Sequence, residues 1–215
     1  MHISEGLMSA PVLAGGAALT VIGLTIGLKS LRSEDIPRAS ILSAVFFVAS
    51  LIHVPVGPSS AHLVLNGLIG TIMGWASFPI IFMGLLLQGL LFNFGGLTTL
   101  GLNTFNMAAP AVLVGIALRP LVNSSMIGIA PLAGFLGGGL PVFLSAVLVA
   151  LSLYLTGEQF KLVAVQVIIG NFPVMIIESI VVMFCIKFLK KVRPEILDPR
   201  AAKGSSDGAL EGVSA

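Results

Sequence analysis

The groups best suited to chemistry in this chain lie in its first two residues. Met1 carries a free α-amine, and His2 contributes a backbone amide nitrogen and an imidazole. Removal of an initiator methionine requires a small second residue, so we expect Met1 to be retained in front of histidine. The amine, the deprotonated amide and Nδ1 of His2 can then enclose a divalent metal ion in fused five- and six-membered chelate rings.

The other histidines of the chain can supply a fourth nitrogen to this chelate. The sequence holds 3 histidines, and His53 and His62 lie close together in the segment IHVPVGPSSAHL. Four nitrogens in one plane suit Ni(II) or Cu(II), and Co(II) accepts a similar set with an adjusted geometry. Zn(II) prefers a tetrahedron, and Mg(II) or Mn(II) prefer oxygen ligands, so these ions fit the pattern less well.

Local sequence favours His62 over His53 as the fourth ligand. The Gly-Pro-Ser-Ser motif before His62 is typical of a turn and a helix start, with Ser59 or Ser60 as the N-cap. We therefore predict that His62 lies in the first turn of a helix. His53 stands two residues before Pro55, at the end of the preceding predicted helix. We interpret His53 as a residue that orients the ligands or lines the entry path.

A glycine-rich stretch, FGGLTTLG, occupies residues 94–101 between two apolar segments. Irregular backbone at membrane depth is tolerated only where protein or water surrounds it. Two interpretations remain open: the stretch is a simple turn, or it is a lid over the metal ion. In the second case Asn93, Asn103 or Asn106 would hydrogen-bond to the ligands.

The composition identifies a helical membrane protein. Charged residues make up 9% of the 215-residue chain, against about 25% in soluble domains, and the mean hydropathy is +1.08. Apolar runs long enough to cross a hydrocarbon core, about 20 residues each, recur between residues 7 and 190. The low charge argues against nucleic acid as a partner. Cys185 is the single cysteine, which excludes an internal disulfide and a CxxC metal site.

These runs predict an all-α polytopic membrane protein with about seven transmembrane helices in one domain, residues 1–193. Residues 194–215 are polar, small and partly charged, and we expect them to form a short disordered cytoplasmic tail. The predicted helices lie near 9–28, 39–54, 59–75, 78–93, 104–120, 126–156 and 160–188, the last with a kink at Pro173.

The distribution of charge predicts the orientation in the membrane. With the N-terminus outside and the C-terminus inside, the inner loops hold every lysine and arginine except Lys161. The opposite orientation would invert this ratio and break the positive-inside rule. All three histidines then lie on the external side. Glu5 is the only charge before Lys29, so the N-terminus lacks the basic region of a secretory signal and we expect it to be retained.

Glu178 is the ionisable residue that lies deepest in the predicted spans. It follows the start of the last helix by 18 residues, which places it roughly 27 Å along that helix and too far inside to join an external site. We expect it to serve structure or a partner contact. A channel or secondary transporter, the alternative function, would need several such groups along its path. A metal enzyme would need a general base, for which Glu5 is near, but a four-nitrogen chelate favours holding a metal over activating water.

Four motifs together resemble the CbiM/NikM family, the substrate-capture components of energy-coupling-factor transporters for cobalt and nickel. They are MHISEG at the N-terminus, PVGPSSAHLVLNGLIG at 55–70, FGGLTTLGLNTFNM at 94–107 and GNFPVMIIES at 170–179. The resemblance covers roughly residues 1–190 in order and in spacing. It implies a multi-pass transport subunit in the plasma membrane of a prokaryote, and not an enzyme.

The resemblance also implies a site and partners. The N-terminal segment of the family inserts into the helical bundle, and the family's metal ligands correspond to Met1, His2 and His62 of this sequence. His53 is not matched to a ligand of the family. The transported ion would be Ni(II) or Co(II), with no other cofactor. The expected partners are the lipid bilayer, a transmembrane coupling subunit, ATPase subunits that hydrolyse ATP for the complex and, in some relatives, a small auxiliary membrane subunit.

Overall fold

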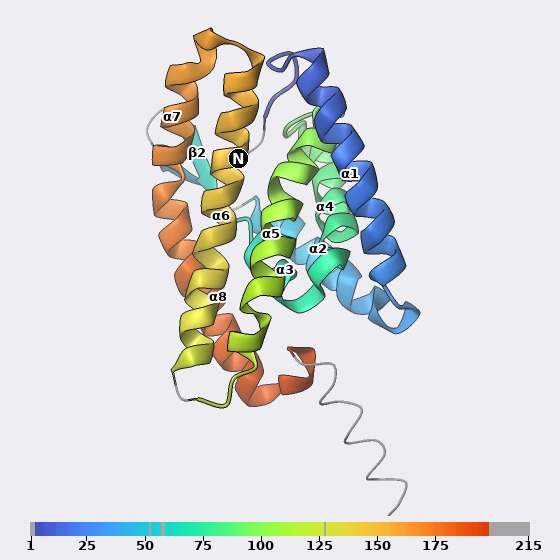
Figure 1. Ribbon diagram of the computed structural model, residues 1–215, viewed down its shortest axis with the longest axis vertical. Helices are drawn as coiled ribbons and strands as arrows, with labels where there is room; N and C mark the ends of the chain where they lie inside the picture. Colours follow the sequence, from blue (N-terminus) through green and yellow to red (C-terminus); the bar gives the residue numbers. More distant parts are fainter. Residues whose placement is uncertain (1–2, 52, 57–58, 127, 198–215) are drawn as a thin grey trace, which may run out of the picture.

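The protein is a bundle of helices with one short β-hairpin (Figure 1). The computed structural model describes residues 3–51, 53–56, 59–126 and 128–197. The helices are α1 (Ala10–Ser30), α2 (Ile36–Ala49), α3 (Asn66–Met73), α4 (Ser77–Phe92), α5 (Leu100–Val122), α6 (Ile129–Thr156), α7 (Lys161–Gly170) and α8 (Phe172–Val192). The strands are β1 (His53–Val56) and β2 (Ser59–His62), and short 3-10 turns are η1 (Ser33–Asp35), η2 (Gly74–Ala76), η3 (Glu158–Phe160) and η4 (Pro194–Ile196).

The long helices run up and down the bundle in turn. We call the end at which α1 begins and α6 ends the upper end, as in Figure 1. From this end α1 and α5 descend, α6 returns upward, and α7 and α8 descend one after the other. The residues before α1 turn back from the upper end into the bundle (Figure 1).

Among the described residues, five helical stretches are long and apolar enough to cross a membrane, which confirms a predominantly helical, multi-pass architecture. α2 has 14 residues and does not reach the roughly 20 residues of a span, although a span is expected there. α3 has 8 residues and reaches span length only together with η2 and α4, so two expected spans form one stretch. The count of seven spans and the external N-terminus stay predictions. The five stretches are Ala10–Ser30, Asn66–Phe92, Leu100–Val122, Ile129–Thr156 and Glu158–Val192.

The prediction that His62 lies in the first turn of a helix is wrong. Residues from Ser59 to His62 form β2, and the helix begins only at Asn66. The serines that resemble an N-cap therefore lie in an extended strand. Their strand is stabilised by pairing with β1, a tertiary contact that the local motif does not reveal.

The prediction that His53 ends a helix is also wrong. The helix expected over 39–54 ends at Ala49, and His53 begins β1. The two strands are antiparallel, and the register sets His53 opposite His62. Pro55 disfavours a helical conformation at the residue before it, and the β-branched valines on either side of it favour an extended backbone.

The remaining boundaries differ from prediction by a few residues. α6 continues without a break through the glycine-rich segment 134–141, and the last predicted helix is divided at Asn171, two residues before Pro173. The first residues of the expected tail are ordered, since η4 follows α8 and Leu197 is 3% exposed in an apolar cluster with α8. The rest of that tail lies outside the described residues.

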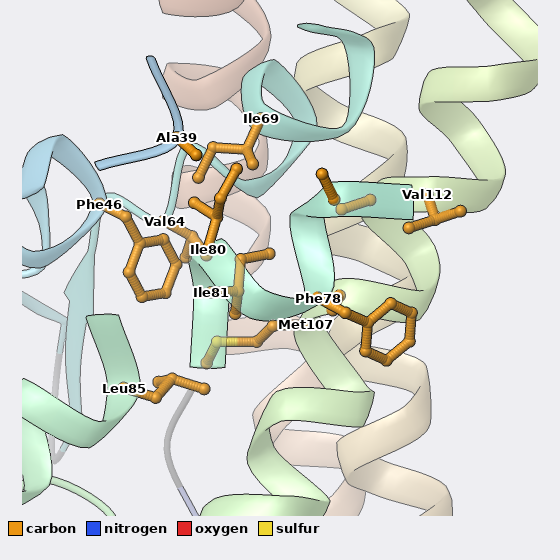
Figure 2. Close-up of a cluster of buried hydrophobic side chains, with 13 residues drawn as sticks. Ala39, Phe46, Val64, Ile69, Phe78, Ile80, Ile81, Leu85, Met107 and Val112 are labelled. Atoms are coloured by element: carbon orange, nitrogen blue, oxygen red, sulfur yellow. The ribbon is translucent and has the colours of Figure 1, made fainter. Parts of the chain in front are cut away.

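The main apolar core lies where α2 and α4 meet α5. Figure 2 shows Phe46 of α2, Ile81 and Leu85 of α4 and Met107 of α5 around Val64. All five side chains are at most 3% exposed. Val64 follows β2 in the chain, so the core that joins these helices also holds the inner end of the hairpin.

The short helix α3 fits between α5 and α6 because its inner face is made of glycine. A Cβ atom at Gly70 would lie 1.9 Å from the carbonyl oxygen of Ala111, and one at Gly67 would lie 1.9 Å from that of Gly137. Backbones can approach this closely only where small residues meet. The position of α3 directly after the hairpin therefore depends on these two glycines.

We predict that Gly70→Ala destabilises the protein, because the added methyl group meets the backbone of α5 rather than a movable side chain. Overpacking of this kind costs about 1–3 kcal/mol. Gly15→Ala is the matched control, since a Cβ atom at Gly15 in α1 would have nothing within 4 Å. Thermal unfolding in detergent measures both variants, and equal stability of the two would contradict the packing described for α3.

Candidate metal-binding site

The N-terminal segment is fixed inside the bundle by the side-chain amide of Asn103. The backbone nitrogen of Ile3 donates to Oδ1 of Asn103 at 3.0 Å, and Nδ2 of Asn103 donates to the carbonyl oxygen of Ile3 at 3.1 Å. Nδ2 also donates to Oγ1 of Thr99 at 3.2 Å, one turn earlier on the same side of α5. Asn103 thus pairs both backbone polar groups of Ile3 and ties them to α5.

Apolar contacts hold the same segment. Ile3 and Met8 are 3% and 9% exposed and belong to a cluster formed by α5, α6 and α7. The predicted insertion of the N-terminus into the bundle is therefore observed from Ile3 onward. Met1 and His2 themselves lie outside the described residues.

The glycine-rich stretch packs on the N-terminal segment. Oε1 of Glu5 accepts hydrogen bonds from the backbone nitrogen of Thr98 at 3.0 Å and from its hydroxyl at 3.3 Å. Gly96 has φ 118°, and a Cβ atom there would lie 2.0 Å from Cγ of Glu5, so this close approach requires glycine. The backbone hydrogen bond from Thr98 lowers the pKa of Glu5. The stretch is therefore more than a simple turn, because it binds the residues that lead to His2.

His62 is buried, with 5% of its surface exposed, and its ring is oriented by its own backbone. Nδ1 lies 3.1 Å from the carbonyl oxygen of Leu63. A carbonyl oxygen only accepts hydrogen bonds, so this contact favours the tautomer with the proton on Nδ1. In that tautomer Nε2 carries the lone pair that a metal ligand needs.

The hairpin places the two neighbouring histidines at one register position. His53 and His62 are paired residues of β1 and β2. Residues directly opposite in an antiparallel pair have their Cβ atoms about 5 Å apart on the same face. The side chain of His53 lies outside the described part of the structure, so its expected role rests on this register alone.

Glu178 is where the structure departs most from the sequence-based expectation. Its side chain is fully buried, and Oε1 accepts hydrogen bonds from the backbone nitrogens of Val64 and Leu65, the latter at 2.8 Å. Its Oε2 lies 3.1 Å from the same nitrogen of Leu65. The depth estimate separated Glu178 from the site because it assumed that His62 lay at the surface. The hairpin instead carries the residues after His62 down to α8.

α5 brings the two candidate ligand segments to neighbouring turns. Asn103 binds Ile3, and four residues later the carbonyl oxygen of Met107 accepts a hydrogen bond from Nδ2 of Asn66 at 3.0 Å. Four residues of helix span about 6 Å, so the two anchors lie about one helical turn apart along α5. Asn106 lies between them, 2% exposed, with Nδ2 3.5 Å from Oγ of Ser152. Asn66 was not among the predicted site residues, because its only signal in the sequence is a polar residue in an apolar run.

Comparison with known proteins identifies the family. The family model described as the cobalt uptake substrate-specific transmembrane region, CbiM, matches residues 2–196. The chain belongs to the CbiM family. This confirms the resemblance to CbiM and NikM proteins that the four motifs indicated, and it makes the chain a membrane component of cobalt or nickel transport.

Individual relatives and a solved structure agree with this assignment. A protein of Haemophilus influenzae described as a metal transport protein is 40% identical over 92% of this chain and 97% of its own length. The fused nickel transport protein NikMN of Rhodobacter capsulatus is 27% identical over 98% of this chain and 67% of its own length. The crystal structure of a truncated transition metal transporter matches 89% of this CbiM-family chain and 99% of its own, with a TM-score of 0.77 and 27% identity.

We predict that Asn103→Ala releases the N-terminal segment, because it removes both hydrogen bonds to Ile3. At about 1 kcal/mol each, their loss corresponds to roughly 30-fold faster hydrogen exchange at the Ile3 amide. Asn171→Ala is the control, since the amide of Asn171 donates to Val167 within its own helical turn. Unchanged exchange at Ile3 in Asn103→Ala would mean that apolar packing alone fixes the segment.

We also predict a defined pH range for the contact between Glu5 and Thr98. The folded-state pKa of Glu5 is lowered from its ordinary value of 4.5, so the contact is fully present above that value and is lost only as the pH falls through the lowered pKa. The amide resonance of Thr98 should therefore stay constant from about pH 8 to pH 5 and shift only in more acidic solution. In Glu5→Gln this transition should be absent, and a transition near neutral pH in the wild type would disprove the assignment.

Proposed function

We propose that this chain captures Ni(II) or Co(II) for uptake, with the α-amine of Met1, the amide and imidazole nitrogens of His2 and the imidazole of His62 as ligands. The observation that carries this proposal is the pair of anchors on α5. Ile3 is held at Asn103 and Asn66 at Met107, about 6 Å apart along the helix. His2 is covalently adjacent to the first anchor, and His62 lies four residues before the second.

The state of His62 supports the same ligand set. The contact of Nδ1 with the Leu63 carbonyl favours a neutral ring with its lone pair on Nε2, the form in which imidazole binds metals. His53, Asn103 and Asn106 complete the proposal as residues that position the ligands and not as ligands themselves. Asn103 does so through Ile3, and His53 through its register opposite His62.

We propose that uptake is driven by ATP hydrolysed on separate subunits of an energy-coupling-factor transporter. The binding face would be external and the C-terminus cytoplasmic, in the plasma membrane of a prokaryote. A transmembrane coupling subunit and ATPase subunits would be the partners, with a small auxiliary membrane subunit. The fused NikMN relative supports such partners, because this chain matches 67% of its length and further protein is joined to the matching part.

A stand-alone channel or secondary transporter fits the interior of the bundle less well. Such a protein needs ionisable groups along its path through the membrane. In the described part of the chain, the buried ionisable side chains are His62 and Glu178. The carboxyl group of Glu178 accepts hydrogen bonds from two backbone amides, so it is engaged in structure rather than exposed to a path.

We predict that purified protein binds one equivalent of Ni(II) with the yellow, diamagnetic spectrum of a square-planar nitrogen site. One residue inserted between Met1 and His2 breaks the fused chelate, and His62→Ala removes the fourth nitrogen. Loss of a positioning contact typically costs 10–100-fold in affinity, so we expect loss of a ligand to cost more than about 100-fold.

The variant to compare with His62→Ala is His53→Ala, which removes the residue paired with His62. Because we propose that His53 positions a ligand and is not one, this variant should keep the square-planar spectrum and bind Ni(II) about 10–100-fold more weakly. Titration with Ni(II) and with Co(II), followed by absorption and by calorimetry, measures all four proteins. Full binding by the extended protein and by His62→Ala would refute the ligand set. Tight binding of Co(II) in preference to Ni(II) would leave the set intact and identify cobalt as the transported metal.

A further inference from the structure

A single peptide group connects the buried carboxyl group of Glu178 to the ring of His62. The carbonyl oxygen of Leu63 and the backbone nitrogen of Val64 belong to the same peptide bond. That nitrogen donates to Oε1 of Glu178, and that oxygen lies 3.1 Å from Nδ1 of His62. Because a peptide group is planar and rigid, fixing its N–H also fixes the direction of its C=O.

We infer that Glu178 is a positioning residue that sets the orientation and the tautomer of His62 through the Leu63–Val64 peptide group. In many metal sites a carboxylate or a carbonyl group binds the second ring nitrogen of a histidine ligand and thereby selects the nitrogen that faces the metal. In this chain the carbonyl of Leu63 contacts the ring, and Glu178 holds that carbonyl in place from the other side of the peptide.

The surroundings of Glu178 prevent this peptide from turning. Oε1 also accepts a hydrogen bond from the nitrogen of Leu65 at 2.8 Å, so two consecutive amides point at one carboxyl group. Leu65 adopts a left-handed conformation, with φ 54°, which turns its amide toward α8. Both Val64 and Glu178 are at most 1% exposed, and water therefore does not compete for these donors.

Glycines in α6 allow α8 to bring Glu178 this far into the bundle. A Cβ atom at Gly138 would lie 2.3 Å from the carbonyl oxygen of Glu178, and one at Gly139 would lie 2.3 Å from Oγ of Ser179. The two helices are therefore in close contact at the turn of α8 that carries Glu178, and the contact continues at Gly134, where a Cβ atom would lie 3.0 Å from Cα of Met183. A bulkier residue at Gly138 or Gly139 would move the carboxyl group away from the hairpin.

The first test reads the tautomer directly and needs no metal. In full-length protein labelled with ¹⁵N-histidine, the protonated and unprotonated ring nitrogens give separate signals, and the His62 signals are assigned by their absence in His62→Ala. At about pH 8, above the ordinary histidine pKa, we expect the form protonated on Nδ1 to dominate in the wild type. In Glu178→Gln we expect the form protonated on Nε2 to become the majority. Both carboxyl oxygens face the hairpin amides, so the NH2 group that replaces one of them meets a backbone N–H, which is also a donor, and pushes the peptide out of place.

Gln88→Leu is the matched control for this experiment. Gln88 is fully buried in α4, and within the described residues its side-chain atoms have no hydrogen-bond partner. The variant therefore removes a buried polar group without a link to the hairpin, and its His62 signals should match the wild type. Identical tautomer populations in Glu178→Gln and wild type would overturn the inference. If Glu178→Gln does not fold, Glu178→Asp, shorter by one methylene, is used with the same criterion.

The second test measures metal affinity, and this part of the inference rests on the proposed role of His62 as a ligand. Glu178→Gln should weaken Ni(II) binding at least tenfold in the wild-type background and should have no effect in the His62→Ala background. Equal losses in both backgrounds would show that Glu178 acts through general stability, which contradicts the inference. Absence of metal binding by the wild type would refute the proposed function but not the effect of Glu178 on His62, because the tautomer is measured in protein without metal.

Discussion

Every polar backbone group in the interior of this bundle must have a hydrogen-bond partner, and the architecture around the site depends on that constraint. Helices meet it internally, but residues 3–8 and 63–65 are not helical and still lie among apolar helices. An unpaired amide in such surroundings costs several kcal/mol, and no lipid can compensate for it. Side chains of the helices take over this task. Asn103 pairs both groups of Ile3, and Glu178 accepts from Val64 and Leu65.

Features that depend on local sequence and composition were predictable. Apolar runs located α1, α4, α5 and α6 within a few residues, because a helix in a membrane satisfies its own backbone and needs no information from distant residues. The histidine motif and the N-terminal Met-His pair indicated the family, which the match to CbiM confirms. Asn103 was predicted to hydrogen-bond to the ligands; it binds Ile3, next to His2 in the chain, and its role toward the ligands stays a prediction.

Features that depend on contacts between distant segments were not predictable from one sequence. The Gly-Pro-Ser-Ser motif before His62 has the residues of a helix start, and only pairing with β1 makes it a strand. Glu178 was assigned to a remote level because helix depth was counted along α8 alone, as if the chain before α3 stayed at the membrane surface. The hairpin brings the residues after His62 close to Glu178, and no periodic pattern in the sequence predicts a hairpin there.

The extended path of the hairpin and the buried carboxyl group require each other. In a helix starting at Ser59, the amide of Val64 would donate to the carbonyl four residues earlier, and Glu178 would have no donor. A carboxyl group buried without partners is strongly unfavourable, so that arrangement would expel α8 from its contact with α6. In the observed structure the left-handed Leu65 costs about 1–2 kcal/mol, and the hydrogen bonds from Val64 and Leu65 to the carboxyl group, worth about 1 kcal/mol each, offset it. Two motifs more than a hundred residues apart, one with His62 and one with Glu178, therefore form one unit, held together by the backbone between His62 and α3.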